Sequence, residues 1–122
     1  MEATARAKFV RMPPRKARQV ADLIRGKTVN QALSILLTVP RVSAREIEKT
    51  LDSAVANAVQ KAEGTKLDID ELLVSAIAID GGPIIKRIRT RARGRANRMR
   101  HRTSHITVTV STDLAAGSAR EG

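Results

Sequence analysis

Apolar and polar residues alternate along the first nine positions of the chain. The apolar members occupy odd positions and are Ala3, Ala5, Ala7 and Phe9. A period of two places successive side chains on opposite faces of an extended chain. The pattern predicts a first strand over residues 3–9 whose apolar face, Phe9 included, turns toward the core. Pro13-Pro14 should end it.

Between residues 14 and 64 the apolar residues recur at helical spacing, in three separate stretches. Pro14 suits the first turn of a helix, and the first stretch runs from there to Arg25. Gly26 is a natural stop at its carboxyl end. The apolar side of this predicted helix consists of Ala17, Val20, Ala21, Leu23 and Ile24.

The other two stretches predict a short helix and a long one. Asn30 is a candidate N-cap for the short helix, which ends before Pro40. Ser43 opens the long helix, because Ser43-Ala44-Arg45-Glu46 fits a capping box, and Gly64 ends it. The apolar positions are Ala32, Leu33, Leu36 and Leu37 in the short helix and Ile47, Leu51, Ala54, Val55, Ala58, Val59 and Ala62 in the long one.

Two further strands are predicted downstream. Residues 72–79 form an apolar run that contains β-branched residues, and residues 106–110 alternate between apolar residues and threonine. Ile106, Val108 and Val110 therefore share one face, which should turn inward. Together with the first strand and the helices, these strands predict an α+β fold.

The segment between these two strands is strongly basic. Nine of the 17 residues from Lys86 to Arg102 are Lys or Arg, and none is acidic. Basic runs are most often only a solvated face. Here the density of charge, the bias toward arginine and the apolar strands on both sides favour a binding function, because a soluble domain would not otherwise stabilise such a segment.

Spacing within the basic segment predicts a hairpin. Arginines lie at odd positions from 87 to 95 and at even positions from 98 to 102, so the parity changes close to Gly94. If the flanking strands pair in register, the midpoint falls near Ala92-Arg93. Both arguments place the tip of an arm at about residues 91–95.

The predicted arm covers about residues 81–104. Gly81-Gly82-Pro83 would let its outgoing strand bend as it leaves the sheet. At about 3.3 Å per residue the arm would project roughly 40 Å. A two-stranded ribbon of that length is marginal alone, so it should become ordered on a polyanion.

A second basic group lies near the amino terminus. Arg15, Arg18 and Arg25 are three and seven residues apart and share a helix face. The helix N-terminus near Pro14 would also offer free amides to a phosphate. A solvated helix face explains the spacing equally well. The whole group is Lys8, Arg11, Arg15, Lys16, Arg18, Arg25 and Lys27.

Composition narrows the class of partner. The 122 residues fit one domain, and their formal charge is +11. Arginine exceeds lysine and suits bidentate phosphate contacts and base stacking, which favours nucleic acid over membrane. No apolar run approaches the roughly 20 residues of a membrane span, and no signal-peptide pattern is present. We expect a cytoplasmic protein with one domain over residues 1–112 and a polar tail over 113–122.

Residues that could carry catalysis or bind metal are sparse. The chain has no cysteine, so Cys-based metal sites are excluded. His101 and His105 are four apart, but in a strand that spacing is about 13 Å. Asp68, Asp70 and Glu71 form a small acidic group that a solvated loop explains. We expect no enzyme activity, no metal and no cofactor.

Several stretches together resemble one known family. They are Pro14-Arg15-Lys16-Ala17-Arg18, Asp22-Leu23-Ile24-Arg25-Gly26-Lys27, Ser53-Ala54-Val55-Ala56-Asn57-Ala58, Gly82-Pro83, Lys86-Arg87 and Arg102-Thr103-Ser104-His105-Ile106-Thr107-Val108. In this order and at this spacing, they resemble the large-subunit ribosomal protein L twenty-two family over about residues 5–111. Two positions depart from the family pattern, because Gly81 stands where an acidic residue is common and Thr90 where proline is common.

The resemblance implies a small antiparallel three-stranded sheet packed on three helices, with a long protruding β-hairpin. It also implies a structural role in the large subunit, with contacts to several domains of large-subunit rRNA and to neighbouring ribosomal proteins, and support of subunit assembly. The hairpin tip would line the peptide exit tunnel and meet the nascent peptide. We expect neither membrane binding nor a homo-oligomer.

These expectations assign residues to two sites. The expected rRNA-binding residues are Lys8, Arg11, Arg15, Lys16, Arg18, Arg25, Lys27, Lys86, Arg87, Arg98, Arg100, Arg102 and His105. The expected tunnel-lining tip is Arg89, Thr90, Arg91, Ala92, Arg93, Gly94 and Arg95.

Two other functions fit the charge. A DNA-architectural protein with a β-ribbon arm is possible by charge alone, but a minor-groove wedge would need an apolar residue or proline at the tip. A cationic membrane-active protein is disfavoured by the lack of aromatic residues and by the non-helical basic segment.

Overall fold

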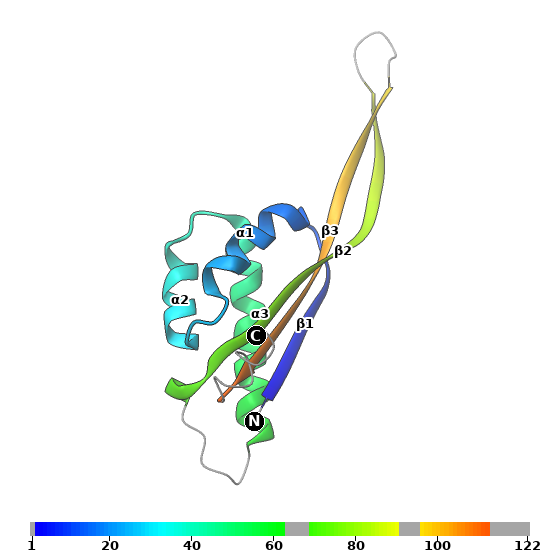
Figure 1. Ribbon diagram of the computed structural model, residues 1–122. Helices are drawn as coiled ribbons and strands as arrows, with labels where there is room; N and C mark the ends of the chain where they lie inside the picture. The colour runs from blue at the N-terminus through cyan, green and yellow to red at the C-terminus, as the bar shows by residue number, and fades with distance from the viewer. Residues whose placement is uncertain (1, 63–68, 91–95, 113–122) are drawn as a thin grey trace, which may run out of the picture.

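The computed structural model describes residues 2–62, 69–90 and 96–112, with backbone only for residues 85–90 and 96–101. Three helices cover one side of a three-stranded sheet, and two of its strands continue well beyond the helices as an arm (Figure 1). The elements are β1 (Glu2–Val10), α1 (Pro14–Ile24), α2 (Val29–Thr38), α3 (Val42–Lys61), the 3-10 turn Ile69–Glu71, β2 (Leu73–Thr90) and β3 (Ala96–Ser111). The fold is therefore α+β, as predicted.

The sheet has the order β1-β3-β2, and both pairings are antiparallel. β3, the last strand in the sequence, therefore lies in the centre. Its inward residues Ile106, Val108 and Val110 are fully buried, which confirms the predicted inward face. The chain first forms the edge strand β1 and then the three helices. The other edge strand, β2, and the central strand, β3, follow.

On the sheet, the core consists of three rows of paired residues, each of which crosses all three strands. Each row joins an alanine of β1 to a larger residue of β3 and of β2; Ala5, Val108 and Ile77 form the middle one. The fully buried alanines of the helices, including Ala17, Ala21, Ala54 and Ala58, allow close approach in place of aromatic rings. Alanines and branched aliphatic residues thus make up most of the core.

Two helix caps differ from the prediction. Thr28, not Asn30, caps α2. Its hydroxyl accepts a hydrogen bond from the backbone amide of Gln31, and the Gln31 side-chain oxygen accepts one from the backbone amide of Thr28. α3 begins one residue before Ser43, so Ser43 lies inside the first turn and the N-cap residue Arg41 makes no side-chain cap bond. The predicted capping box at Ser43 is therefore wrong. The predicted stop at Gly64 lies outside the described residues.

Four residues assigned to apolar faces are exposed. They are Phe9, Leu23, Leu37 and Val59, and the exposed fraction of Phe9 is 62%. Phe9 leaves the predicted face because the β1–β3 register shifts between Ala7 and Val10, and its φ is +58°. The irregularity rotates the end of β1 away from the core. Leu23, Leu37 and Val59 are each next in sequence to a buried residue of the same helix, so they lie at the margins of the buried stripes.

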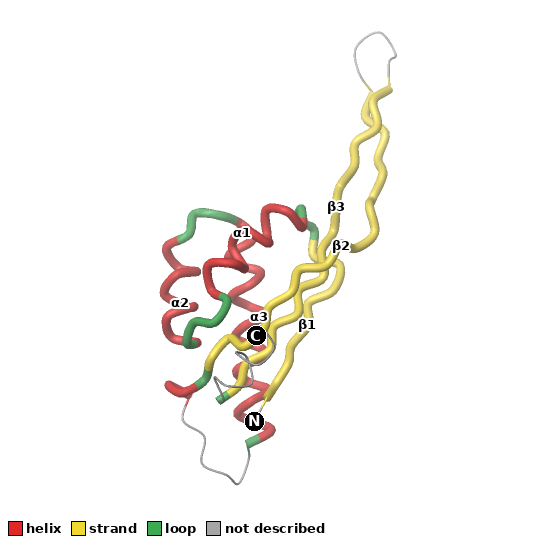
Figure 2. Tube along the Cα trace, in the orientation of Figure 1, coloured by secondary structure: helices red, strands yellow, loops and turns green. Residues whose placement is uncertain are grey.

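The arm is a direct continuation of β2 and β3 (Figure 2). Backbone pairing runs from Ile84 opposite Arg102 to Thr90 opposite Ala96, which is about 20 Å at the usual rise of a strand. The pairing agrees with the predicted hairpin as far as Thr90 and Ala96, and the predicted tip at residues 91–95 lies outside the described residues. The register also shifts between Gly81 and Ile84, at the predicted bend.

Candidate nucleic-acid interface

The basic residues of the arm occupy both of its strands. Lys86, Arg87 and Arg89 lie in β2 with Thr90, and Arg98, Arg100 and Arg102 lie in β3. Lys86 is paired with Arg100, Arg87 with Met99, Ile88 with Arg98 and Arg89 with Asn97. Each of these consecutive pairs therefore contains at least one basic residue. The rest of the predicted tip, residues 91–95, lies outside the described residues.

Three consecutive residues of β3 bind the base of the arm to the body, namely Thr103, Ser104 and His105. The Ser104 hydroxyl donates to the Met12 carbonyl at 2.7 Å, and the Thr103 hydroxyl donates to the Pro83 carbonyl at 2.6 Å. Both side chains are buried. The hydrogen bonds join β3 to the turn that follows β1 on one side and to the bend of β2 on the other, which fixes where the arm leaves the body.

His105 completes this junction. Its Nδ1 accepts the amide of Phe9 at 3.1 Å, and the two rings meet edge to face with centroids 5.0 Å apart. The contact holds Phe9 in its unusual backbone conformation. The structure thus gives His105 an intramolecular role, and contact between His105 and rRNA stays a prediction.

Two of the predicted RNA-binding arginines, Arg18 in α1 and Arg25 directly after it, also have partners within the protein. Arg18 Nε donates to the Ile79 carbonyl at 3.0 Å, and an Arg25 Nη donates to the Ile77 carbonyl at 2.9 Å. Arg25 also pairs with the Asp22 carboxylate. Both arginines therefore donate to carbonyls of β2, which leaves their role in RNA binding a prediction.

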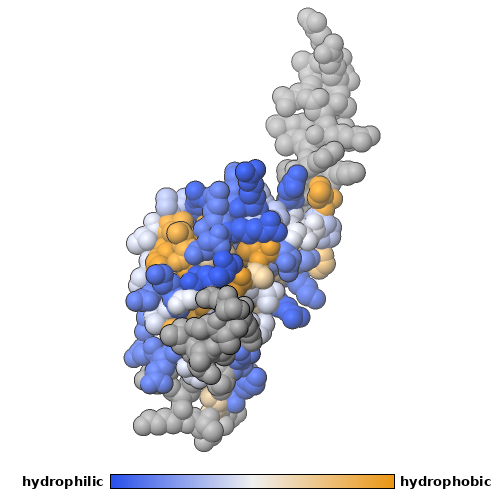
Figure 3. Space-filling view, viewed as in Figure 1, coloured by the Kyte–Doolittle hydropathy of each residue, from blue (hydrophilic) through white to orange (hydrophobic). Residues whose placement is uncertain are grey.

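The remaining basic residues of the amino-terminal group lie at the surface. Lys8, Arg11, Arg15, Lys16 and Lys27 are all exposed. Hydrophilic residues gather on the upper part of the body, beside the base of the arm, in the space-filling view (Figure 3). Arg11, Arg15 and Lys16 come together with Arg41, which precedes α3, around one open groove. The sequence does not single out Arg41, because it lies far along the chain from the amino-terminal basic group.

Other kinds of site find little support in the described part of the chain. No group of three or more metal-ligating side chains occurs there. No helix in that part is long and apolar enough to cross a membrane. Asp70 accepts a hydrogen bond from the Asn30 amide at 2.8 Å, so this acidic residue helps to join the 3-10 turn to α2.

Comparison with known proteins decides the family. Residues 5–111 match the family described as ribosomal protein L22p/L17e. The chain belongs to this family. Its members are structural, non-enzymatic proteins of the ribosome, which agrees with the prediction that the chain is not an enzyme.

Curated relatives cover nearly the same length. The chain is 50% identical over 111 residues to the large ribosomal subunit protein uL22 of Geobacter sulfurreducens, a match that covers 91% of this chain and 97% of the relative. It is 51% identical over 113 residues to the uL22 of Fusobacterium nucleatum, which covers 93% and 99%. The uL22 of Syntrophomonas wolfei is 53% identical over 110 residues, covering 90% and 95%. The L22p/L17e resemblance noted in the sequence is thus confirmed.

Proposed function

We propose that this chain is a structural constituent of the large ribosomal subunit that binds large-subunit rRNA in the bacterial cytoplasm. It does so through two surfaces, the arm and the exposed basic residues around the start of α1. Residues 1–112 act as one domain, and residues 113–122 form a tail with no assigned part in binding.

The single observation that carries this proposal is the arm. Seven consecutive backbone pairs, from Ile84–Arg102 to Thr90–Ala96, extend past the helices, and no other described element of the protein packs against them. The segment holds a high density of arginine and no acid. An RNA backbone neutralises such charge and supplies the packing surface that the arm lacks.

The finer roles follow the family. The arm reaches into the subunit, and residues 89–95 at its tip line the peptide exit tunnel next to the nascent peptide. The body contacts several domains of the rRNA and neighbouring ribosomal proteins, and these contacts support subunit assembly. A chain that joins distant RNA segments in this way acts as a monomer, since its partners are RNA and other proteins.

Binding to a transcript of bacterial large-subunit rRNA at increasing salt tests the proposal. If about six phosphates are neutralised, the logarithm of the affinity should fall with the logarithm of salt concentration at a slope of roughly −5. A nearly flat response contradicts phosphate binding. Equal affinity for duplex DNA, without co-sedimentation with large subunits, contradicts a ribosomal role and supports the DNA-architectural alternative.

A further inference from the structure

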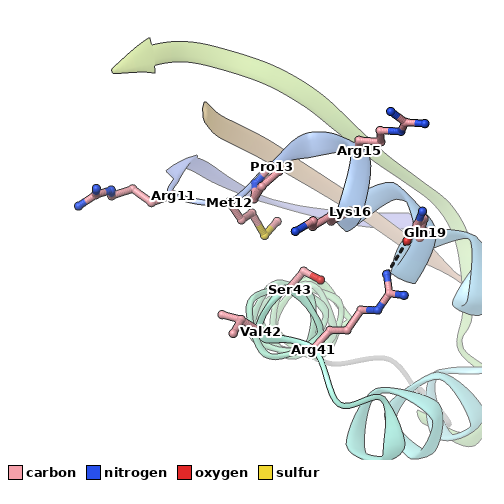
Figure 4. A pocket seen from close by; sticks show the side chains of 9 residues that line it. All are labelled: Arg11, Met12, Pro13, Arg15, Lys16, Gln19, Arg41, Val42 and Ser43. Carbon is pink, nitrogen blue, oxygen red and sulfur yellow. Dashed lines mark hydrogen bonds between the residues drawn. The ribbon is translucent and has the colours of Figure 1, made fainter. Parts of the chain in front are cut away.

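A groove opens between the amino-terminal ends of α1 and α3 (Figure 4). Its volume is about 760 Å³. Four cationic side chains line it and no acidic one does; they are Arg11, Arg15, Lys16 and Arg41. These residues come from two segments that are distant in sequence, so the packing of α3 against α1 creates the groove.

Both helices present unsatisfied amides at this end. The first backbone bond of α1 runs from the Ala17 amide to the Pro13 carbonyl, and that of α3 from the Ala44 amide to the Arg41 carbonyl. Neither helix has a side-chain cap, and no acid lies in either first turn. Two positive helix ends therefore meet at one groove, and such ends attract anions.

Ser43 gives an independent indication of a ligand. The exposed fraction of this residue is 6%, yet it lines the groove and its hydroxyl has no hydrogen-bond partner among the described residues. In the described part of the chain, no side-chain oxygen or nitrogen that is sealed from solvent lacks a partner. The Ser43 hydroxyl is therefore reachable from the groove, toward which it points in Figure 4. It offers a donor that the protein itself does not use.

Arg41 is already held in place for this role. One of its Nη atoms donates to the Gln19 side-chain oxygen across the groove, as the dashed line in Figure 4 shows. This contact orients the guanidinium while its other N–H groups stay exposed. A guanidinium held in one orientation loses less entropy when it binds an anion.

We propose that this groove binds one phosphate of the large-subunit RNA backbone. The Ser43 hydroxyl donates a hydrogen bond to a phosphate oxygen, and Arg41 and Lys16 supply the neutralising charge. The inference rests on the proposed rRNA binding and adds to it a particular contact, made by the body rather than the arm. A free phosphate anion has the same chemistry, so the test separates the two sources.

The test compares full-length variants in binding to the large-subunit rRNA transcript. Ser43→Ala removes the hydroxyl, and Arg41→Gln removes the charge. Matched controls on α3 are Ser53→Ala, an exposed serine outside the groove, and Arg45→Gln, which removes the same charge one turn further along. Thermal unfolding checks that each variant is folded, and alanine is well tolerated inside a helix.

The proposal expects Ser43→Ala to weaken binding about tenfold without changing the salt slope, since a hydrogen bond to a charged group is lost. Arg41→Gln should weaken binding at least fivefold and reduce the slope by about 1. Both controls should stay within twofold of the wild type. If the two groove variants also stay within twofold while the wild type binds RNA, the groove proposal is wrong and the proposed function stands.

Binding of a free phosphate anion is tested separately. The wild type is titrated with inorganic phosphate while NMR monitors the Val42 and Ser43 amides. The groove would bind a free anion if the amide chemical shifts change at millimolar phosphate while the groove variants bind RNA as tightly as the wild type. That result overturns the RNA assignment. If the wild type itself does not bind the rRNA transcript, the proposed function is wrong.

Discussion

Gly82 lies where the outgoing strand of the arm leaves the sheet, in closer contact with β3 than any side chain would allow. A Cβ atom there would lie 2.5 Å from the Thr103 hydroxyl oxygen and 3.2 Å from the His105 ring. Thr103 cannot easily turn aside, because it is buried and already donates to the Pro83 carbonyl. The need for glycine thus comes from the crossing of two backbones at the junction.

We expect Gly82→Ala to lower the free energy of unfolding by about 1–3 kcal/mol, because the added methyl overpacks the junction. Gly81→Ala is the matched control, since a Cβ at Gly81 meets nothing within 4 Å. It should change stability by no more than about 0.5 kcal/mol. Urea unfolding of both variants measures the difference, and equal effects would contradict the packing of the junction.

At the scale of elements, both edges of the sheet are covered by side chains from the helices. Arg18 of α1 and Arg25, which directly follows α1, donate to carbonyls of β2 at one edge. Asn57 and Lys61 of α3 bind the Thr4 and Glu2 carbonyls of β1 at the other edge, at 3.0 Å and 2.8 Å. Uncovered edges invite pairing with other chains, so these long polar residues keep the sheet at three strands.

The double variant Arg18→Met with Arg25→Met tests the covering of the β2 edge. Methionine keeps much of the apolar stem but removes the donors, so the free energy of unfolding should fall by about 1–3 kcal/mol. Arg15→Met is the control, because Arg15 is exposed on α1 and its side chain makes no hydrogen bond within the described part of the chain. If all three substitutions leave the denaturation midpoint unchanged, these arginines serve only external partners.

The periodic elements could be predicted because burial itself is periodic. The inward face of β3 and the alanine stripes of α1 and α3 follow directly from the sequence. Caps could not be predicted as well, since Thr28 and Asn30 are both good capping residues and only the backbone decides which amide is free. Phe9 was misassigned because its exposure depends on a bulge and on His105, almost a hundred residues away.

The candidate site was predicted in the same uneven way. The arm could be predicted because its charge and spacing are local in the sequence. Arg41 and Ser43 were missed as site residues because they reach Lys16 only through the packing of α3 against α1. The intramolecular partners of Arg18 and Arg25 also depend on tertiary contacts with β2, which helix spacing does not contain.

For the molecule as a whole, body and arm are stabilised differently. The body has a core that spans the sheet and all three helices. The described arm has backbone pairing but no further layer of structure against it. The body should therefore fold alone, whereas the arm depends on what it binds.

Replacing residues 86–100 by Asn-Gly tests this division. Ile85 and His101 are opposite each other in the register, so a two-residue turn can close the shortened hairpin. The helical circular dichroism signal and the midpoint of thermal unfolding should stay close to those of the wild type, while RNA affinity falls. Loss of the helical signal would refute the independence of the body.

The most direct test of the whole account locates the arm in assembled large subunits. The chain has no cysteine, so Thr90→Cys gives a unique attachment point for an iron chelate that cleaves nearby RNA through hydroxyl radicals. Ser53→Cys does the same on α3. The account predicts that the Thr90 probe cleaves large-subunit rRNA at the tunnel wall, at nucleotides distinct from any cleaved by the Ser53 probe. Intact rRNA around the Thr90 probe, in subunits that contain the labelled protein, would contradict it.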